Sequence, residues 1–334
     1  MSGVAAARRG SERRATWPML VAGLAVMVVF VGWWLMARPR PGIVEYPMLA
    51  KTDIPAAITA ASNGDVWFTM DFSDAIGVFR NGGITRIQKP GQNLEPLGLA
   101  VDGAGTVWFT DTQTRSIVGL SPDGTARSFP VSTPIVRFGR LAAASDGSVW
   151  FADGASASIT RLKDGVFTPY AAGIDGATPY GIAVDGSGNV WATLQEPDKL
   201  MRISSRGDVA VFDAPDPNSG FGDVAVDASG AVWFLESRLN RIGRFAENRF
   251  TEFAVPTRSA GLTGLAVARN GTVWFTELTA GRIGRIRNGQ VREFAVPRTG
   301  SHPFNVAADP AHNIWYTDLT GWLGMLPAEL AEED

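Results

Sequence analysis

The chain has 334 residues with 38 glycines, 20 prolines, 11 tryptophans and no cysteine, and 19% of its residues are charged. This composition is typical of an ordered, turn-rich protein, and it excludes thiol catalysis, disulfides, iron–sulfur clusters and cysteine-ligated zinc. Residues 1–41 hold six arginines and one glutamate, a charge of +5. Because the whole chain has a net charge of −3, the remaining residues carry −8. No basic stripe exists to neutralise phosphates, so we expect no nucleic-acid partner.

An apolar segment near the N-terminus predicts one transmembrane signal-anchor over residues 15–37. Its core from Trp17 to Met36 would span roughly 30 Å as a helix, which matches a bilayer core. Four arginines precede it within residues 1–14 and two follow it, so residues 1–14 are predicted to be cytoplasmic. We therefore expect a single-pass protein of the inner or plasma membrane, with the rest of the chain periplasmic or extracellular. A signal peptide cleaved after Ala37 is the alternative.

The chain then repeats itself seven times. Each copy contains Val-Trp-Phe-Thr or a close variant, and the tryptophans are 41 or 42 residues apart: Trp67, Trp108, Trp150, Trp191, Trp233, Trp274 and Trp315. Within one unit, four short apolar runs are separated by glycine-rich and Pro-Asp-Gly turns. This pattern predicts an all-β, seven-bladed β-propeller with four-stranded blades over residues 38–327, followed by an acidic tail over residues 328–334.

The fourth strand of the seventh blade is predicted to come from the start of the repeat region. Six units have an aromatic residue or isoleucine 20 or 21 positions after the tryptophan: Ile87, Phe129, Tyr170, Phe212, Phe253 and Phe294. The unit of Trp315 lacks this run, whereas residues 43–46 (Ile-Val-Glu-Tyr) resemble residues 291–294 (Val-Arg-Glu-Phe). Residues 43–46 should therefore close the ring as the outer strand of blade 7.

The most regular copy of the repeat runs from Gly264 to Pro297. It contains Trp-Phe-Thr-Glu at 274–277, Arg-Ile-Gly-Arg-Ile at 282–286 and Glu-Phe-Ala-Val-Pro at 293–297. With these motifs, residues 43–326 resemble the virginiamycin B lyase (streptogramin lyase) propellers. The resemblance implies metal-assisted, non-hydrolytic opening of a cyclic depsipeptide lactone, in which a base removes the proton next to the ester carbonyl and the carboxylate leaves.

The residues that the resemblance would make catalytic are absent from this chain. The family's two histidines fall on Thr263 and Phe304, its glutamate falls on His302, and its lysine falls on Leu319. Neither threonine nor phenylalanine can replace imidazole as a base or metal ligand. We therefore expect no cleavage of type B streptogramins, and no catalytic residue is assigned. His302 is the one weak candidate for a relocated base.

Residues that recur in most blades are expected to serve the blade. Four aspartates at the first turn are predicted to cap backbone amides, and four arginines on the third strand are predicted to pair at the surface or between blades. The aspartates are Asp102, Asp185, Asp227 and Asp309, and the arginines are Arg161, Arg202, Arg244 and Arg285.

Acidic residues stand three positions after five of the seven tryptophans and could form a ring that binds a divalent cation, Mg or Ca. They are Asp111, Asp153, Glu236, Glu277 and Asp318. Hydrogen bonding of each acid within its own loop is the alternative reading.

The positions that depart from the repeat give a second candidate site. Most blades have glycine or alanine just before the first strand, but blades 3, 5 and 7 have Arg140, Asp223 and Asn305. Other side chains are expected at the same level: Glu95, Arg137, Tyr180, His302 and Phe304. Together they would form a polar mouth with aromatic walls, suited to a small molecule or a peptide. The alternative is that they are loop residues that satisfy one another.

These observations favour a membrane-anchored, lyase-like propeller that acts outside the cytoplasm as a ligand-binding or protein-interaction module. An enzyme of another specificity is the alternative: a metal-dependent lyase, or a lactone hydrolase resembling gluconolactonase propellers, acting on a cyclic ester other than streptogramin B. A sensor domain is the third reading.

Overall fold

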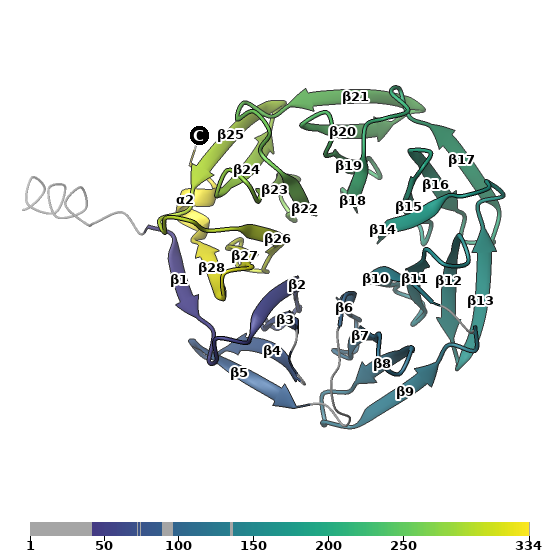
Figure 1. Cartoon of the computed structure of the whole chain (residues 1–334), viewed down its shortest axis with the longest axis horizontal. Coiled ribbons are helices and arrows are strands. Elements are labelled where there is room, and N and C mark those ends of the chain that lie inside the picture. Colours follow the sequence, from purple (N-terminus) through teal and green to yellow (C-terminus); the bar gives the residue numbers. More distant parts are fainter. Residues whose placement is uncertain (1–41, 72, 74, 89–95, 134–135, 334) are drawn as a thin grey trace, which may run out of the picture. The chain divides into compact units, whose positions relative to one another are not determined.

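The computed structural model describes residues 42–71, 73, 75–88, 96–133 and 136–333. Seven four-stranded antiparallel sheets are arranged as blades around one axis, with the first strand of each blade nearest the axis (Figure 1). The predicted all-β, seven-bladed propeller is confirmed. Residues 1–14 and the predicted anchor, residues 15–37, lie outside the described residues. In the described part of the chain, no helix is long and apolar enough to cross a membrane.

The strands follow the chain blade by blade. Blade 1 is β2 (Ile54–Ala60), β3 (Val66–Asp71), β4 (Ala75–Arg80) and β5 (Gly83–Gln88); blade 2 is β6 (Leu99–Val101), β7 (Val107–Asp111), β8 (Ser116–Leu120) and β9 (Ala126–Pro130). Blade 3 is β10 (Phe138–Ala143), β11 (Val149–Asp153), β12 (Ser158–Lys163) and β13 (Val166–Ala171); blade 4 is β14 (Thr178–Val184), β15 (Val190–Gln195), β16 (Lys199–Ile203) and β17 (Val209–Asp213). Blade 5 is β18 (Phe221–Val226), β19 (Val232–Glu236), β20 (Arg241–Ala246) and β21 (Arg249–Ala254); blade 6 is β22 (Leu262–Val267), β23 (Val273–Glu277), β24 (Arg282–Arg287) and β25 (Gln290–Ala295).

Blade 7 joins the two ends of the described chain, as the sequence predicts. It consists of β26 (Pro303–Ala308), β27 (Ile314–Asp318), β28 (Trp322–Leu326) and, as its outer strand, β1 (Val44–Pro47). β1 pairs antiparallel with β28, with Tyr46 opposite Leu323. The ring of Tyr46 stacks on Trp315 with centroids 6.1 Å apart. The pairing covers an edge that blade 7 would otherwise expose.

The aspartates of the first turn cap backbone amides, as predicted, and they also hold the repeated tryptophans. Asp102 Oδ1 accepts hydrogen bonds from the amides of Ala104 and Thr106, each 2.9 Å long, while its Oδ2 accepts from Trp108 Nε1 at 2.8 Å. The same indole–carboxylate bond recurs in three other blades: Trp191 to Asp185, Trp233 to Asp227 and Trp315 to Asp309. One carboxylate therefore fixes both the turn and the indole that packs between blades.

The glycine of the third-strand motif is required by packing within the blade. Gly284 lies opposite Phe275 in the register of β23 and β24. A Cβ added to Gly284 would lie only 2.1 Å from Cζ of Phe275, whose ring is fully buried. The glycine thus makes room for the aromatic side chain of the neighbouring strand.

The C-terminal segment differs from the acidic tail that the sequence predicts. Residues Ala328–Ala331 form a short helix, α2, and Ala331 is buried in a cluster with Trp274. Arg285 and Arg292 donate to backbone carbonyls of residues 331 and 333, which anchors the segment despite its acidic side chains. A count of charges along the sequence does not reveal this backbone contact.

Candidate functional site

At one end of the ring the first strands begin and the second strands end; we call this end the mouth. In five blades a threonine two positions after the tryptophan binds the backbone of the first strand there. Thr193 illustrates the arrangement: its Oγ1 accepts from the amide of Gly181 at 2.9 Å and donates to the carbonyl of Gly222 in the next blade at 2.6 Å. The other four bind in the same way to the first strand of their own blade: Thr69, Thr110, Thr276 and Thr317. The hydroxyl therefore serves as a link at the mouth.

Blades 3 and 5 lack this link, and these two blades carry the charged residues of the mouth. Ala152 and Leu235 occupy their threonine positions, while Arg140 and Asp223 replace the usual glycine or alanine. The register of the first strand shifts at this point in both blades, between Phe138 and Leu141 in blade 3 and between residues 221 and 224 in blade 5. The same shift occurs in blades 1, 4, 6 and 7, so it is a feature of the repeat. Such irregularities redirect a side chain out of the ladder. The missing threonines are therefore a second signal for this site in the sequence, beside the replaced glycines.

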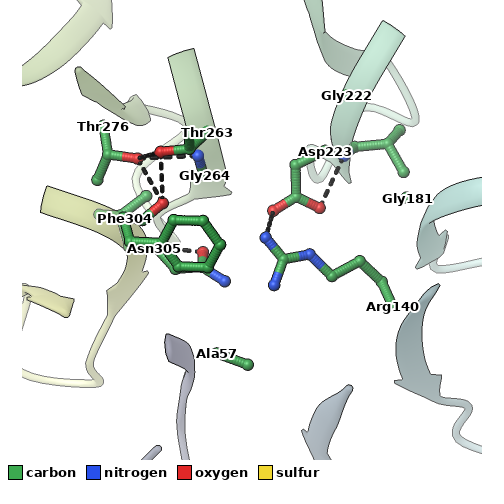
Figure 2. Close-up of polar contacts among 12 residues, drawn as sticks. Ala57, Arg140, Gly181, Gly222, Asp223, Thr263, Gly264, Thr276, Phe304 and Asn305 are labelled. Carbon is green, nitrogen blue, oxygen red and sulfur yellow. Dashed lines mark hydrogen bonds and ion pairs between the residues drawn. The ribbon is translucent and has the colours of Figure 1, made fainter. Parts of the chain in front are cut away.

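Arg140 and Asp223 form an ion pair across the mouth (Figure 2). Arg140 Nη2 lies 3.3 Å from Asp223 Oδ2, and the two residues are 9% and 7% exposed. Asp223 Oδ1 also accepts a hydrogen bond from the amide of Val224 at 3.1 Å. The pair connects blades 3 and 5 past Gly181 of blade 4, so it reaches farther than the threonine links between neighbouring blades.

The pair is charged although it is buried. Burial opposes the charge on Arg140, but the carboxylate of Asp223 together with Tyr180 outweighs burial and raises the pKa of the guanidinium. Burial raises the pKa of Asp223, while Arg140 and the amides of Val224 and Leu265 act against that rise. Since a guanidinium keeps its proton in proteins, we take Asp223 as its ionised partner at neutral pH.

Aromatic side chains and one amide surround the guanidinium. Its central carbon lies 5.7 Å from the ring centroid of Tyr180 and 5.9 Å from that of Phe304, within the range of cation–π contacts. Asn305 Oδ1 accepts from the amide of Val306 at 2.8 Å, and its amide nitrogen points towards the axis (Figure 2). The structure therefore places Arg140, Tyr180, Asp223, Phe304 and Asn305 together at the mouth, and ligand binding by them stays a prediction.

Of the other three residues predicted for the mouth, two are exposed and one is not described by the structure. Glu95 lies outside the described residues. Arg137 and His302 are exposed, and their amides donate to Asp153 and Asp318 within their own blades. Both residues precede the register shift of the first strand. The residues that follow them turn towards the axis, whereas these two do not. His302 is therefore an exposed residue of the loop that precedes β26 in blade 7.

The two positions that the resemblance assigns to histidines are used for packing and blade contacts. Thr263 Oγ1 lies 2.7 Å from the carbonyl oxygen of Phe304 and donates to it across the boundary between blades 6 and 7. The ring of Phe304 faces Arg140. Neither side chain can accept a proton from a substrate carbon, so the lyase's acid–base chemistry cannot occur at these positions.

The five acids at the ends of the second strands do not form the predicted ring. Asp111 accepts from the hydroxyl of Thr114 at 2.7 Å, Asp153 accepts from Ser156 at 2.7 Å, and Asp318 pairs with Arg298 at 2.8 Å. Within the described ranges, no three His, Asp or Glu side chains are placed to hold a metal. Asp111, Asp153 and Asp318 turn into the loops beside them, so the alternative reading, hydrogen bonding within the loop, describes these three acids, and the binding of Mg or Ca stays a prediction.

Glu236 and Glu277 are the exceptions, since their carboxyls are fully buried without a strong partner. Neither carboxylate oxygen of Glu277 has a hydrogen-bond partner among the described residues. Burial, helped by the nearby Glu293 and opposed by Arg282, raises the pKa of Glu277 to about 8. Burial raises the pKa of Glu236 to about 7 for the same reason, with Glu252 adding to the rise. These two acids hold protons near neutral pH and are poor metal ligands there.

The fold and site define a seven-bladed propeller with a charged, aromatic-lined mouth. The sequence matches the virginiamycin B lyase family over residues 38–170 and 91–326. The chain belongs to this family. A virginiamycin B lyase from Nocardia farcinica is 30% identical over 204 residues, which cover 60% of this chain and 70% of that protein.

Solved structures show the same fold. A catalytically inactive histidine-to-alanine variant of virginiamycin B lyase from Staphylococcus aureus, crystallised with quinupristin, superimposes with a TM-score of 0.80 at 25% identity. The match covers 85% of this chain and 98% of that one. A streptogramin B lyase structure gives a TM-score of 0.81 at 24% identity, covering 85% of this chain and 97% of that one.

Proposed function

We propose that this protein is a membrane-anchored, extracytoplasmic binding module whose mouth holds a small ligand between Arg140 and Asp223. The ligand would carry an anionic or carbonyl group for Arg140, a hydrogen-bond donor for Asp223 and an apolar ring that fits beside Tyr180 and Phe304. The observation that carries the proposal is the buried ion pair, placed where most blades have glycine or alanine.

The energetic cost of that pair supports a binding role. Removing two charges from water costs several kcal/mol per ion, and such pairs add little net stability compared with well-packed apolar residues. Blades 4 and 6 show that a glycine and a threonine suffice to link neighbouring blades at this level, since Thr193 donates to the carbonyl of Gly222 and Thr276 to that of Phe304. The charged pair of Arg140 and Asp223 joins two blades and places a guanidinium and a carboxylate at the mouth. Ligand recognition explains this arrangement better than stabilisation of the fold does.

The aromatic walls support the same reading and define the ligand class further. Tyr180 and Phe304 flank the guanidinium, which lets a flat apolar group stack while its polar substituent meets the charge. Because Phe304 and Thr263 stand where lyase relatives are expected to have histidines, binding without lactone opening is the expected outcome.

The membrane part of the proposal is supported by sequence alone. Residues 15–37 form an uncharged segment of spanning length, and the arginines on its N-terminal side exceed those on the other. A reporter fused to the C-terminus that is active only outside the cytoplasm tests this arrangement. Activity of the reporter together with membrane fractionation is the expected result, whereas an inactive fusion contradicts it.

Titration of the purified full chain with phenylacetate, phenethylamine and phenylacetamide tests the binding site. We expect phenylacetate to bind most tightly, because only this probe presents a carboxylate to Arg140. The double variant Arg140→Gly/Asp223→Gly restores the regular repeat residue in both blades and should abolish that preference. Arg161→Ala removes an arginine at the other end of blade 3 and serves as the matched control.

Two outcomes would contradict the proposal. If the double variant binds phenylacetate as the unaltered chain does, the pair is structural. If the chain inactivates a type B streptogramin above background and loses that activity on His302→Ala, the protein is a lyase with a relocated base.

A further inference from the structure

Grooves recur between consecutive blades at the turn end of the ring, opposite the mouth. Each is walled by the repeated tryptophan, by an arginine above it and by the turns of the following blade. Between blades 1 and 2 the cavity measures about 740 Å³, between blades 3 and 4 about 420 Å³, and between blades 4 and 5 about 220 Å³. The first two lie within the size range of ligand sites, roughly 300 to 1,000 Å³.

Between blades 6 and 7, the chain itself shows what occupies this position. α2 follows the third strand of blade 7, where the other blades have the turn to their fourth strand. Leu330 and Ala331 pack in the cluster of Trp274, and Arg285 Nη1 donates to the carbonyls of Ala331 and Glu333, each at 2.7 Å. A short segment with small apolar residues and backbone carbonyls thus fits the wall formed by Trp274 and Arg285.

The groove between blades 3 and 4 contains a carboxylate of its own blade. Asp146 pairs with Arg161 at 2.6 Å and with Lys163 at 2.8 Å. Hydrogen bonds from Lys163 and Ser148 outweigh burial and hold the pKa of Asp146 well below its usual range. A single carboxylate, that of Asp146, therefore already holds both Arg161 and Lys163 at short distances, and an acidic segment entering this groove would have to displace it.

The groove between blades 1 and 2 is larger and its cation is less tightly paired. The guanidinium of Arg80 lies 5.1 Å from the ring of Trp67, and its distance to Asp65 is 3.6 Å. Apolar side chains complete the lining, among them Ile87 and Leu120. This combination matches the wall that holds α2, with one arginine in place of the three that bind carbonyls there, Arg285, Arg287 and Arg292.

We propose that the groove between blades 1 and 2 binds a partner protein through a short segment chemically like residues 327–333 of this chain. Such a segment has small apolar residues that enter the groove beside Trp67, followed by acidic residues and carbonyls that meet Arg80. The site lies at the opposite end of the ring from the mouth, so it does not depend on the ligand proposed there.

A labelled synthetic peptide of residues 327–334 (Pro-Ala-Glu-Leu-Ala-Glu-Glu-Asp) is the probe, titrated into the full chain in mild detergent by fluorescence anisotropy. We expect saturable binding that Arg80→Ala weakens about tenfold. Arg244→Ala removes an equivalent arginine that stands 5.5 Å from the ring of Trp233 and should leave binding unchanged. Asp65→Asn should strengthen binding about threefold, because it frees Arg80 from its counter-ion, a gain that damage to the fold could not produce.

A photo-cross-linking version of the same peptide locates the site. Cross-links to residues 61–65 and 103–105 are expected, and a peptide whose four acids are replaced by amides should bind less tightly. Absence of binding overturns the proposal, as does binding that is insensitive to both Arg80→Ala and Asp65→Asn. Cross-links confined to blades 6 and 7 would also overturn it, because they would show exchange with the chain's own C-terminal segment.

Discussion

Blades 4 and 6 are joined to their neighbours at the mouth by a threonine hydroxyl, whereas blades 3 and 5 are joined to each other by an ion pair. In blade 4 the link is short and local, from Thr193 to the backbone of Gly222 in the next blade. In blades 3 and 5 it is long and crosses the mouth, from Arg140 to Asp223. The threonine link shows that the fold needs only a hydroxyl at this level. The ion pair is therefore not required by the fold.

Both kinds of link can form only in a closed ring of blades. Deletion of residues 42–48 is therefore expected to have the largest effect on stability. It removes β1, with its whole ladder to β28 and the stacking of Tyr46 on Trp315. The loss should exceed about 5 kcal/mol and abolish cooperative folding. Thermal unfolding followed by circular dichroism measures it. A melting temperature equal to that of the unaltered chain would show that the ring closes without β1.

Breaking the irregular link on one side is the next largest change. Arg140→Ala leaves Asp223 buried without its partner and should cost about 3–5 kcal/mol of unfolding free energy. The double variant Arg140→Gly/Asp223→Gly removes both charges and should be markedly more stable than the single variant. Urea denaturation of the single variants Arg140→Gly and Asp223→Gly and of the double variant gives the coupling energy directly. Strict additivity would mean that the two charges do not interact.

The buried acids next to the mouth make stability depend on pH. The folded-state pKa is about 7 for Glu236 and about 8 for Glu277, both raised mainly by burial above the usual value of 4.5. Between the usual pKa of 4.5 and these raised values, the folded state therefore holds more protons than the unfolded state. The free energy of unfolding should fall by a few kcal/mol as pH rises from about 5 to 8. Glu277→Gln should reduce that slope; an unchanged pH profile would show that the carboxyl is ionised in the folded chain.

The regular link can be tested by removing a single hydroxyl. Thr193→Val leaves the amide of Gly181 and the carbonyl of Gly222 without their hydrogen-bond partner and should cost about 1–3 kcal/mol. Thr168→Val, at an exposed position on the outer strand β13, should change stability by no more than about 0.5 kcal/mol. Equal effects of the two substitutions would remove the basis for treating the threonine as a link between blades.

The sequence by itself determined the repeat, the number of blades, the closing strand and the capping aspartates. These features depend on local patterns: alternation of apolar residues, turn residues at fixed offsets and a carboxylate six residues before an indole, as in Asp102 and Trp108. The same repeat also indicates which residues depart from it: Arg140 and Asp223 stand where most blades have glycine or alanine.

Only the tertiary structure decided which departures meet. The approach of Arg140 to Asp223 depends on how seven blades close around one axis and on strand irregularities that aim single side chains. The five acids show the converse: equal spacing along the chain suggested a ring, but each carboxylate instead finds donors in its own loop or stays buried. Spacing fixes which end of a blade a residue occupies, whereas packing of neighbouring loops and blades fixes its direction, its protonation and its partner.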